Sequence, residues 1–244
     1  MHNLKLTIEY EGTAYHGWQV QPALPTIQGV LQETAKRISG EEVHVTGAGR
    51  TDAGVHAIGQ VANFRTGKDL AADRWQRAFN GLLPPDIVVR HVEMAPEDFD
   101  ARRSATQKTY RYTILNAPYA SAIDRHWLLH VPEPLQIASM AEAASSLLGE
   151  HDFSAFRAAD GDSHNAIRRM SEARFDTVEG RLRFTITGDG FLKYMIRIVV
   201  GTLLDVGKGR VTPDRFREIL QSKDRQRAGR TAPAHGLCLM HVRY

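Results

Sequence analysis

Three glycines, an arginine, a threonine and an aspartate stand together in one short stretch of the chain, where their types would allow chemistry on a bound ligand. The stretch runs from Gly47 to Ala57 and reads GAGRTDAGVHA. Glycines let a backbone turn sharply and come close to a ligand, and Arg50, Thr51 and Asp52 add a cation, a hydroxyl and a carboxylate to that turn. A glycine-rich hairpin turn with a capping aspartate has the same spacing, so the pattern alone leaves both interpretations open.

The common cofactor and metal motifs are missing from the sequence. In the dinucleotide pattern G-x-G-x-x-G the third glycine would fall at position 52, where an aspartate would repel phosphate. The P-loop pattern fails because Gly201 and Gly207-Lys208-Gly209 have one residue too many between them and lack the final Ser or Thr. His126 and His130 have no apparent third ligand, so no metal site is predicted.

Arg197 is the second residue whose position indicates chemistry. It lies within the apolar sequence FLKYMIRIVV, where a guanidinium buried in a helix must find an anionic partner. Asp52 is one candidate for that partner. The alternatives are that Arg197 pairs with Asp189 or Asp205, or that its side chain extends to solvent.

Tyr110 and Leu237 carry weaker signals. Tyr110 lies in the alternating sequence KTYRY between basic residues, and Tyr112 shares its face of the predicted strand. Aromatic and apolar residues on strands usually belong to the core. Taken alone, both positions are therefore interpreted as core residues.

The composition is that of a globular protein long enough for one large domain or two modest ones. Of its 244 residues, 42% are hydrophobic and 24% are charged. The longest apolar stretch, 191–204, is interrupted by Lys193 and Arg197 and predicts no membrane span, and residues 1–10 do not resemble a secretory signal. Because Cys238 is the only cysteine, no disulfide can form within the chain, which favours the reducing cytoplasm.

Basic residues are unevenly distributed and could present a positive face to a polyanion. The formal net charge is only +3, but cations gather at Arg102–Arg103, Lys108, Arg111, Arg168–Arg169 and Lys223–Arg230. Such clusters usually form solvated surface, so composition by itself does not establish nucleic-acid binding.

Hydrophobic periodicity predicts the order β-α-β-β-α-β for the first half of the chain. Strands are predicted at 3–10, 43–46, 58–65 and 86–93, with one helix from Thr26 to the residue before Gly40 and a second at 70–80. Thr26 is the expected N-cap of the first helix.

The second half is predicted to repeat that order with one additional helix. The elements are a strand at 107–115, a helix at 134–148, a hairpin around Glu179-Gly180, helices at 191–205 and 212–221, and a strand at 236–243. The sequence therefore predicts an α+β fold of two ferredoxin-like halves, 1–100 and 101–244, whose antiparallel sheets merge around a central cleft. A ligand is expected in that cleft.

The stretch GRTDAGVHA at 49–57 resembles the active-site motif of the TruA family of tRNA pseudouridine synthases. Further segments match that family in the same order: SATQKTYRY at 104–112, LLGEHDFSAFR at 147–157, FLKYMIRIVVGTLL at 191–204 and TAPAHGLCL at 231–239. The resemblance thus extends along the chain. Cys238 departs from it, because family members often carry an aromatic residue at this position.

The resemblance implies a pseudouridine synthase fold and an isomerase that needs no cofactor. It makes Asp52 the nucleophile and Arg197 the basic active-site residue. Tyr110 would stack on the target uracil and take part in proton transfer at C5, and Leu237 would pack against the base. If the motif is extended, Arg50 faces the same side as Asp52 and would help to hold an extruded nucleotide, whereas a surface salt bridge is its alternative role.

The resemblance also implies the substrate and the assembly. A cytoplasmic homodimer would bind tRNA and modify uridines at positions 38–40 of the anticodon stem-loop. Two other classes fit the predicted topology. One is a tandem RNA-recognition-motif protein without catalysis, but the RNP1 aromatic pattern of such proteins is missing from this sequence. The other is a small-molecule lyase or transferase, which would leave the basic clusters unused.

Overall fold

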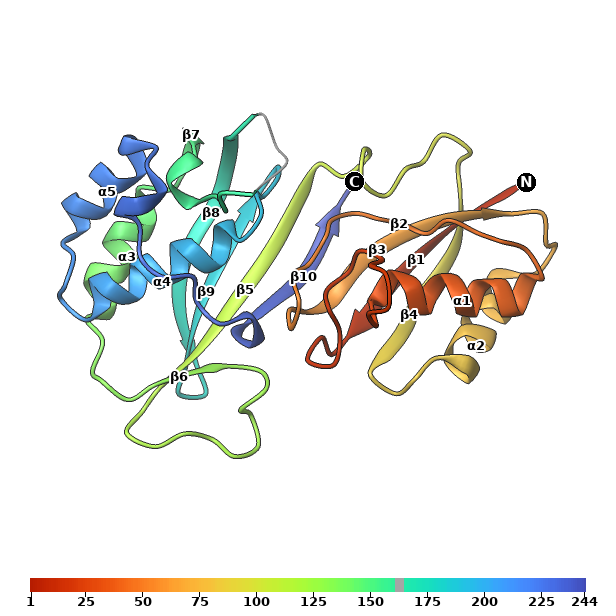
Figure 1. The fold of residues 1–244 in the computed structure, drawn as a ribbon, viewed down its shortest axis with the longest axis horizontal. Coiled ribbons are helices and arrows are strands. Elements are labelled where there is room, and N and C mark those ends of the chain that lie inside the picture. Colours follow the sequence, from red (N-terminus) through yellow and green to blue (C-terminus); the bar gives the residue numbers. More distant parts are fainter. Residues whose placement is uncertain (161–164) are drawn as a thin grey trace. The chain divides into compact units, whose positions relative to one another are not determined.

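The computed structural model describes residues 1–160 and 165–244 and divides the chain into two units (Figure 1). Unit 1 contains Met1–Thr106 together with Cys238–Tyr244, and unit 2 contains Gln107–Leu237. The last residues of the sequence therefore belong to the first unit. This long-range pairing leaves no trace in local periodicity.

Unit 1 combines one sheet with two helices. Its elements are β1 (His2–Tyr10), α1 (Ile27–Ser39), β2 (Thr46–Gly47), β3 (His56–Thr66), α2 (Ala72–Leu82), β4 (Ile87–Ala95) and most of β10 (Leu237–Arg243). The strands lie in the order β4-β1-β3-β10, and β2 pairs with β3. β1 is antiparallel to β3 and β4, whereas β10 is parallel to β3. The predicted succession of strands and helices is observed in this part of the chain.

The predicted strand at 43–46 is wrong except at its last residue. Only Thr46 and Gly47 pair with β3. The backbone of Val45 is instead held by side chains of α1: Gln28 Nε2 donates to its carbonyl over 2.8 Å, and its N–H donates to Gln32 Oε1 over 3.2 Å. Because these amides satisfy the peptide groups, the segment needs no ladder partner.

The helices of unit 1 begin and contact the sheet as their sequences suggest. Thr26 caps α1, as predicted, by accepting a hydrogen bond from the N–H of Gly29 over 3.3 Å. In α2, Trp75 and Phe79 place their rings 5.4 and 6.0 Å from the ring of Phe64 on β3. All three side chains are fully buried, so they anchor the helix to the strand that follows the glycine-rich motif.

Unit 2 also combines a sheet with helices, which Figure 1 shows gathered beside it. Its elements are β5 (Gln107–Asn116), β6 (Leu129–Val131), α3 (Ile137–Ser145), β7 (Gly149–Asp152), β8 (Ile167–Val178), β9 (Arg181–Gly188), α4 (Met195–Gly207) and α5 (Pro213–Ser222), with short 3₁₀ turns between them. The strands lie in the order β5-β9-β8-β7 and are antiparallel, and β6 pairs in parallel with β5. The predicted hairpin at Glu179-Gly180 is confirmed.

Two predicted helices of this unit are shorter than their apolar sequences. The helix predicted at 134–148 covers Ile137–Ser145, and the one predicted at 191–205 starts only at Met195. Tyr194 has a left-handed backbone, with φ at 61°, so residues before it cannot continue the helix. α4 has 13 residues where a span needs about 20, and no helix in the described part of the chain is long and apolar enough to cross a membrane.

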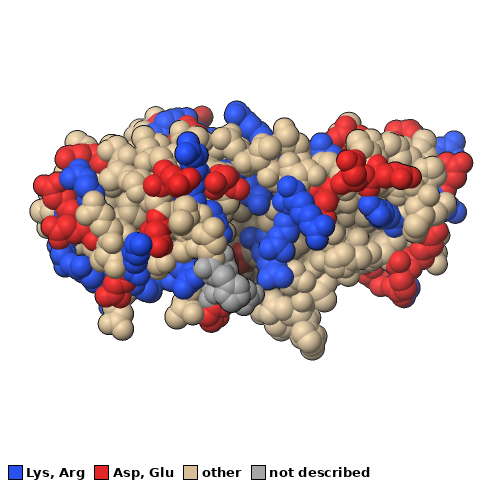
Figure 2. Space-filling model, turned by 90° about the horizontal axis from the view of Figure 1, so that it is seen from above, with Lys and Arg blue, Asp and Glu red and all other residues tan. Residues whose placement is uncertain are grey.

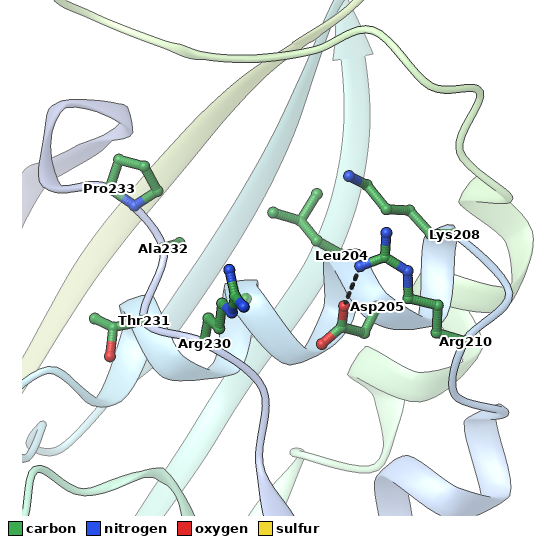
Figure 3. Close-up of a pocket in the computed structure, with 9 residues that line it drawn as sticks. Leu204, Asp205, Lys208, Arg210, Arg230, Thr231, Ala232 and Pro233 are labelled. Carbon is green, nitrogen blue, oxygen red and sulfur yellow. Dashed lines mark hydrogen bonds and ion pairs between the residues drawn. The ribbon is translucent and has the colours of Figure 1, made fainter.

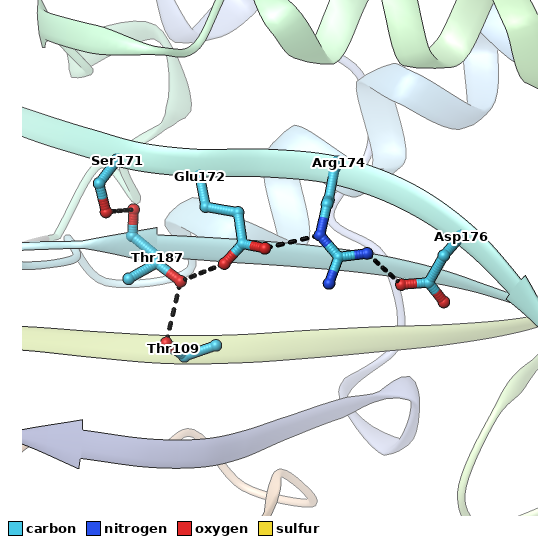
Figure 4. A network of polar contacts seen from close by, with 6 residues as sticks. All are labelled: Thr109, Ser171, Glu172, Arg174, Asp176 and Thr187. Carbon is cyan, nitrogen blue, oxygen red and sulfur yellow. Dashed lines mark hydrogen bonds and ion pairs between the residues drawn. The ribbon is translucent and has the colours of Figure 1, made fainter.

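The sheet of unit 2 carries a polar network on one face and aromatic residues on the other. Figure 4 shows the network, in which Thr109 bonds to Thr187 over 2.9 Å, Thr187 donates to Glu172 over 2.8 Å, and Arg174 bridges Glu172 and Asp176 over 2.6 Å each. These contacts connect β5, β9 and β8. Because side chains alternate along a strand, the neighbours of Thr109 and Arg111 on β5 face the core, and these are the tyrosines of KTYRY.

Candidate functional site

The glycine-rich motif forms the loop between β2 and β3. Within it Thr51 is buried, while Arg50 is exposed and Asp52 is half-buried. Thr51 Oγ1 and the hydroxyl of Tyr10 share a hydrogen bond of 2.8 Å. The threonine therefore anchors the loop to β1 and leaves the residues on either side of it nearer the surface.

Gln60 on β3 strengthens that anchor. Its Nε2 donates to the carbonyl of Gly49 over 2.9 Å and to the hydroxyl of Tyr10 over 3.4 Å. Burial raises the pKa of Tyr10, against the opposing effect of its bonds to Thr51 and Gln60. The phenol thus stays protonated at neutral pH and remains a hydrogen-bonding group beneath the loop.

The segment around residues 12–18 clamps the other side of the loop. The N–H of Trp18 donates to the carbonyl of Thr51 over 3.0 Å, and the N–H of Gly54 donates to the carbonyl of Tyr15 over 3.3 Å. Gly17 has φ at 87°, and a Cβ there would lie 2.6 Å from the Thr51 carbonyl. Only glycine permits this close approach, which fixes the backbone on the N-terminal side of Asp52.

Asp52 itself begins a tight turn into β3. Its carbonyl accepts a hydrogen bond from the N–H of Val55 over 3.1 Å, and Gly54 supplies the left-handed residue with φ at 77°. The carboxylate is therefore carried on a backbone that is held at both ends. Arg50 donates from Nε to Gln19 Oε1 over 3.1 Å, a contact with an amide at the surface.

Arg197 lies in the first turn of α4 and is oriented by two contacts. Its Nε donates to the carbonyl of Ala232 over 2.8 Å, and its guanidinium carbon lies 4.9 Å from the centre of the Tyr194 ring. Of the alternative partners considered from the sequence, Asp205 pairs with Arg210 over 3.4 Å, and Asp189 accepts the N–H of Arg169 over 3.1 Å. Both carboxylates thus have other partners in the structure.

The tyrosines of β5 lie close to the same segment. Tyr110 is buried, and its ring meets that of Phe191 edge-on at 5.1 Å. The Tyr112 hydroxyl donates to the carbonyl of Pro233 over 2.7 Å. Burial raises the pKa of Tyr112, and the charge of Arg197 opposes this shift. Arg197 and Tyr112 therefore hold neighbouring carbonyls of one segment, which we call the 231–237 segment.

The 231–237 segment ends at Leu237, which is buried where β10 begins. His235 lies within it, and burial together with the charges of His126 and Arg197 lowers its pKa, so the imidazole is neutral at pH 7. The predicted site residues thus fall into two sets. Unit 1 contains Arg50 and Asp52, and unit 2 contains Tyr110, Arg197 and Leu237.

The sequence did not indicate the residues that support these side chains. Tyr10 and Gln60 were visible only as members of strands, and nothing local showed that they reach the loop. Tyr112 was assigned to the core, and its hydroxyl bond to Pro233 depends on a segment more than a hundred positions away. Hydrogen-bond partners of this kind have no periodic signature, so only the structure reveals them.

Close packing between α4 and Arg230, the residue before the 231–237 segment, gives a stability prediction. A Cβ on Gly201 would lie 1.7 Å from the carbonyl oxygen of Arg230, so Gly201→Ala must push the two backbones apart. We expect a loss of roughly 1–3 kcal/mol in the free energy of unfolding, measured by denaturant titration. The matched control is Gly81→Ala in α2, where a Cβ meets nothing within 4 Å. This variant should be unchanged or stabilised by about 0.5–1 kcal/mol, and equal effects at both positions would contradict the packing argument.

Charges on the surface are mixed. On the face in view, Figure 2 shows groups of Lys and Arg with Asp and Glu between them. Some of the predicted basic clusters are partly neutralised: Arg169 lies 3.8 Å from Glu150, and Lys223 lies 3.2 Å from Asp152. Binding of a polyanion would therefore depend on particular cations and not on a uniformly positive face.

Comparison with known proteins gives matches along the chain. Residues 6–102 and 143–244 match a family model described as tRNA pseudouridine synthase. Proteins named tRNA pseudouridine synthase A include one from Acetivibrio thermocellus, 46% identical with both chains fully covered, and one from Myxococcus xanthus, 47% identical over all of this chain and 92% of that protein. A chain in a crystal structure of a Cbf5-Nop10-Gar1 complex aligns with 96% of this chain and 57% of its own length, at 12% identity and a TM-score of 0.36.

Proposed function

The chain belongs to the tRNA pseudouridine synthase family, and from this premise we propose that it converts uridine to pseudouridine at positions 38–40 of the tRNA anticodon stem-loop. The observation that carries the proposal is the loop of Asp52. The family match includes this loop, and its backbone is anchored through Thr51 and clamped by Gly17. A carboxylate held in this way is suited to act as a nucleophile.

The reaction is an internal rearrangement of the nucleotide. The bond between N1 and C1′ breaks, the uracil turns, and a bond between C5 and C1′ forms. One proton leaves C5 and one is gained at N1, so atoms and electrons balance without an oxidant or a further group. We assign Asp52 as the nucleophile, and the proposal holds for attack at C1′ or at C6 because both need an ionised carboxylate.

Arg197 is proposed to face the Asp52 carboxylate during the reaction. Its Nε is bound to the Ala232 carbonyl, which fixes the plane of the guanidinium and directs its terminal nitrogens. Its place in the first turn of α4 adds the positive end of the helix dipole. Both effects would favour the anionic form of a neighbouring carboxylate.

The other site residues are proposed to handle the substrate. Tyr110 would stack on the target uracil and serve the proton transfer at C5, and Leu237 would contact the base from another side. Arg50, exposed beside Asp52, would grip phosphates or enter the space left by the extruded nucleotide. Its contact with Gln19 is compatible with this role, because an amide is exchanged for a phosphate at little cost.

We further infer a fold of two ferredoxin-like halves at 1–100 and 101–244, a homodimer, and action in the cytoplasm without a cofactor. The strand and helix order of unit 1 supports the first of these inferences. The reaction as balanced above supports action without a cofactor, since it requires no group from outside the nucleotide.

The proposal is tested by incubating the purified protein alone with tRNA labelled in its uridines. We expect labelled pseudouridine to form in wild-type tRNA and not in tRNA whose uridines at 38–40 are replaced by cytidine. Binding without any pseudouridine would favour a non-catalytic RNA-binding protein and overturn the proposal. Pseudouridine formed in the substituted tRNA would support the proposed reaction and contradict its assignment to positions 38–40.

Tyr110 allows the ring and the hydroxyl to be tested separately. Tyr110→Phe keeps the edge contact with Phe191, so binding of the nucleotide should persist while product formation slows by about 10²-fold or more if the hydroxyl transfers the proton. Tyr110→Ala should impair both roles. Rates are measured in single-turnover assays on protein shown to be folded by circular dichroism, and wild-type rates for the alanine variant would remove Tyr110 from the site.

A further inference from the structure

A cavity of about 690 Å³ lies in unit 2 beside α4 (Figure 3). Its helix side is formed by Gly201, Leu204 and Asp205 on one face of α4, together with Lys208, the C-cap residue of that helix. Arg197 lies on this face one turn before Gly201. Since a helix rises about 1.5 Å per residue, the cavity extends to roughly 16 Å from Arg197 along the axis. The far side is formed by residues 230–233.

The lining of this cavity is positively charged. Lys208, Arg210 and Arg230 contribute three cations against the single carboxylate of Asp205, which leaves a net charge of +2. Asp205 is engaged by Arg210, whose Nη1 lies 3.4 Å from its Oδ1, and Figure 3 shows this pair at one end of the cavity. In the described part of the chain no carboxylate pairs with Arg230.

The wall that carries Arg230 is held in place by the protein itself. Arg225 donates from Nη1 to the carbonyls of Ala228 and Gly229 over 3.3 and 3.1 Å. The N–H of Gly229 donates to Thr202 Oγ1 on α4 over 2.9 Å. Together with the bond from Arg197 Nε to the Ala232 carbonyl, these contacts hold the backbone on both sides of Arg230, which lowers the entropic cost of binding.

We propose that this cavity binds a backbone phosphate of the tRNA substrate, at a distance from the reacting nucleotide. The proposal rests on the proposed function for the identity of the RNA. Guanidinium and ammonium groups are the usual donors to phosphate oxygens, and three of them line this cavity. Among the described residues that line the cavity none is aromatic, so it offers a base no surface for stacking.

The ion pair of Lys208 modulates this site. Its Nζ lies 2.9 Å from Glu133 Oε1, outside the lining, and this contact lowers the pKa of Glu133. An ionised glutamate therefore competes with phosphate for Lys208. Removing the charge of Glu133 should strengthen tRNA binding, whereas removing the charge of Arg230 should weaken it.

The test measures tRNA affinity by filter binding over a range of salt concentrations. Arg230→Gln should weaken binding about 5- to 8-fold at about 0.1 M salt and reduce the slope of log K against log salt by about 1. Arg230→Lys should restore most of the tRNA affinity and most of the salt slope. Glu133→Gln should tighten binding, because it releases Lys208.

Matched controls change the same charges elsewhere on the surface. Arg77→Gln removes a cation paired with Asp73 on α2, and Glu218→Gln removes an anion paired with Arg215 on α5. Both should leave the salt slope within error of wild type. If Arg230→Gln also leaves it unchanged, or if Arg77→Gln lowers it equally, the cavity is not a phosphate site.

The outcome is separable from that of the proposed function. The salt slope of Arg230→Gln tests the cavity, whereas pseudouridine formation by the wild-type protein tests the proposed function. A wild-type protein that binds tRNA but forms no pseudouridine would overturn the proposed function. The slopes of log K against log salt would still test whether the cavity binds phosphate. If the wild-type protein forms pseudouridine and the salt slope of Arg230→Gln is unchanged, only the phosphate-binding role of the cavity is overturned.

Discussion

Asp52→Asn should leave a folded protein that binds tRNA and forms no detectable pseudouridine, a loss of at least about 10³-fold. An amide has the shape of the carboxylate but is neither anionic nor comparably nucleophilic. The fold should persist because the loop is held through Thr51 and its backbone, not through the Asp52 side chain alone. Rates are measured by release or detection of labelled product, and tRNA affinity by filter binding.

A second carboxylate serves as the control for this substitution. Asp73→Asn removes an exposed aspartate that pairs with Arg77 on α2 and should leave turnover unchanged. Normal turnover by Asp52→Asn would end its assignment as the nucleophile. A variant that neither turns over nor binds tRNA would instead show that Asp52 organises the loop.

Arg197→Met should reduce pseudouridine formation by at least about 10²-fold while keeping α4 folded. Methionine retains the apolar stem of the side chain and removes its charge and its bond to Ala232. If Arg197 stabilises the anionic nucleophile, this electrostatic loss acts on the reaction itself. Arg197→Lys restores the charge without the planar donor group and should give an intermediate rate.

Unfolding measurements on the single and double variants test whether the two residues meet. If the two side chains pair, Arg197→Met alone would leave the Asp52 carboxylate without a partner in a poorly solvated site, which is unfavourable. Combining it with Asp52→Asn removes that orphaned charge, so the double variant should be more stable than the sum of the two single effects. Additive free energies within about 0.5 kcal/mol would show that Arg197 and Asp52 do not interact.

Most strands and helices could be predicted because their side chains alternate or recur with the period of the element. β1 and α1 follow this rule closely, whereas the β8–β9 hairpin was predicted at its turn residues, Glu179-Gly180. The strand predicted at 43–46 failed because Gln28 and Gln32 take over the peptide groups of Val45, a tertiary contact that apolar alternation does not encode. The start of α4 was misplaced for a local reason, since the left-handed backbone of Tyr194 ends the helix within the mainly apolar sequence 191–204.

The candidate site was predictable to the extent that its chemistry lies in side chains of one motif. The spacing of Asp52 and its glycines fitted a functional loop and a structural turn equally well, and the expected role of Asp52 came from the resemblance. The support of the loop by Tyr10 and the binding of Arg197 to a backbone carbonyl could not be predicted. A carbonyl is present at every residue, so sequence cannot show which one a guanidinium will select.

The pairing of β10 with β3 in unit 1 affects how the chain folds during its synthesis. β10 pairs with the start of β3 through Cys238 and Leu239, opposite His56 and Ala57, directly after the Asp52 loop. On the ribosome the edge of β3 stays open while all of unit 2 is synthesised, which takes on the order of ten seconds at about 5–20 residues per second. A nascent chain therefore carries Asp52 long before the strand beside its loop is in place. Chains released before residue 238 would expose that edge to other strands and should be prone to aggregation and degradation.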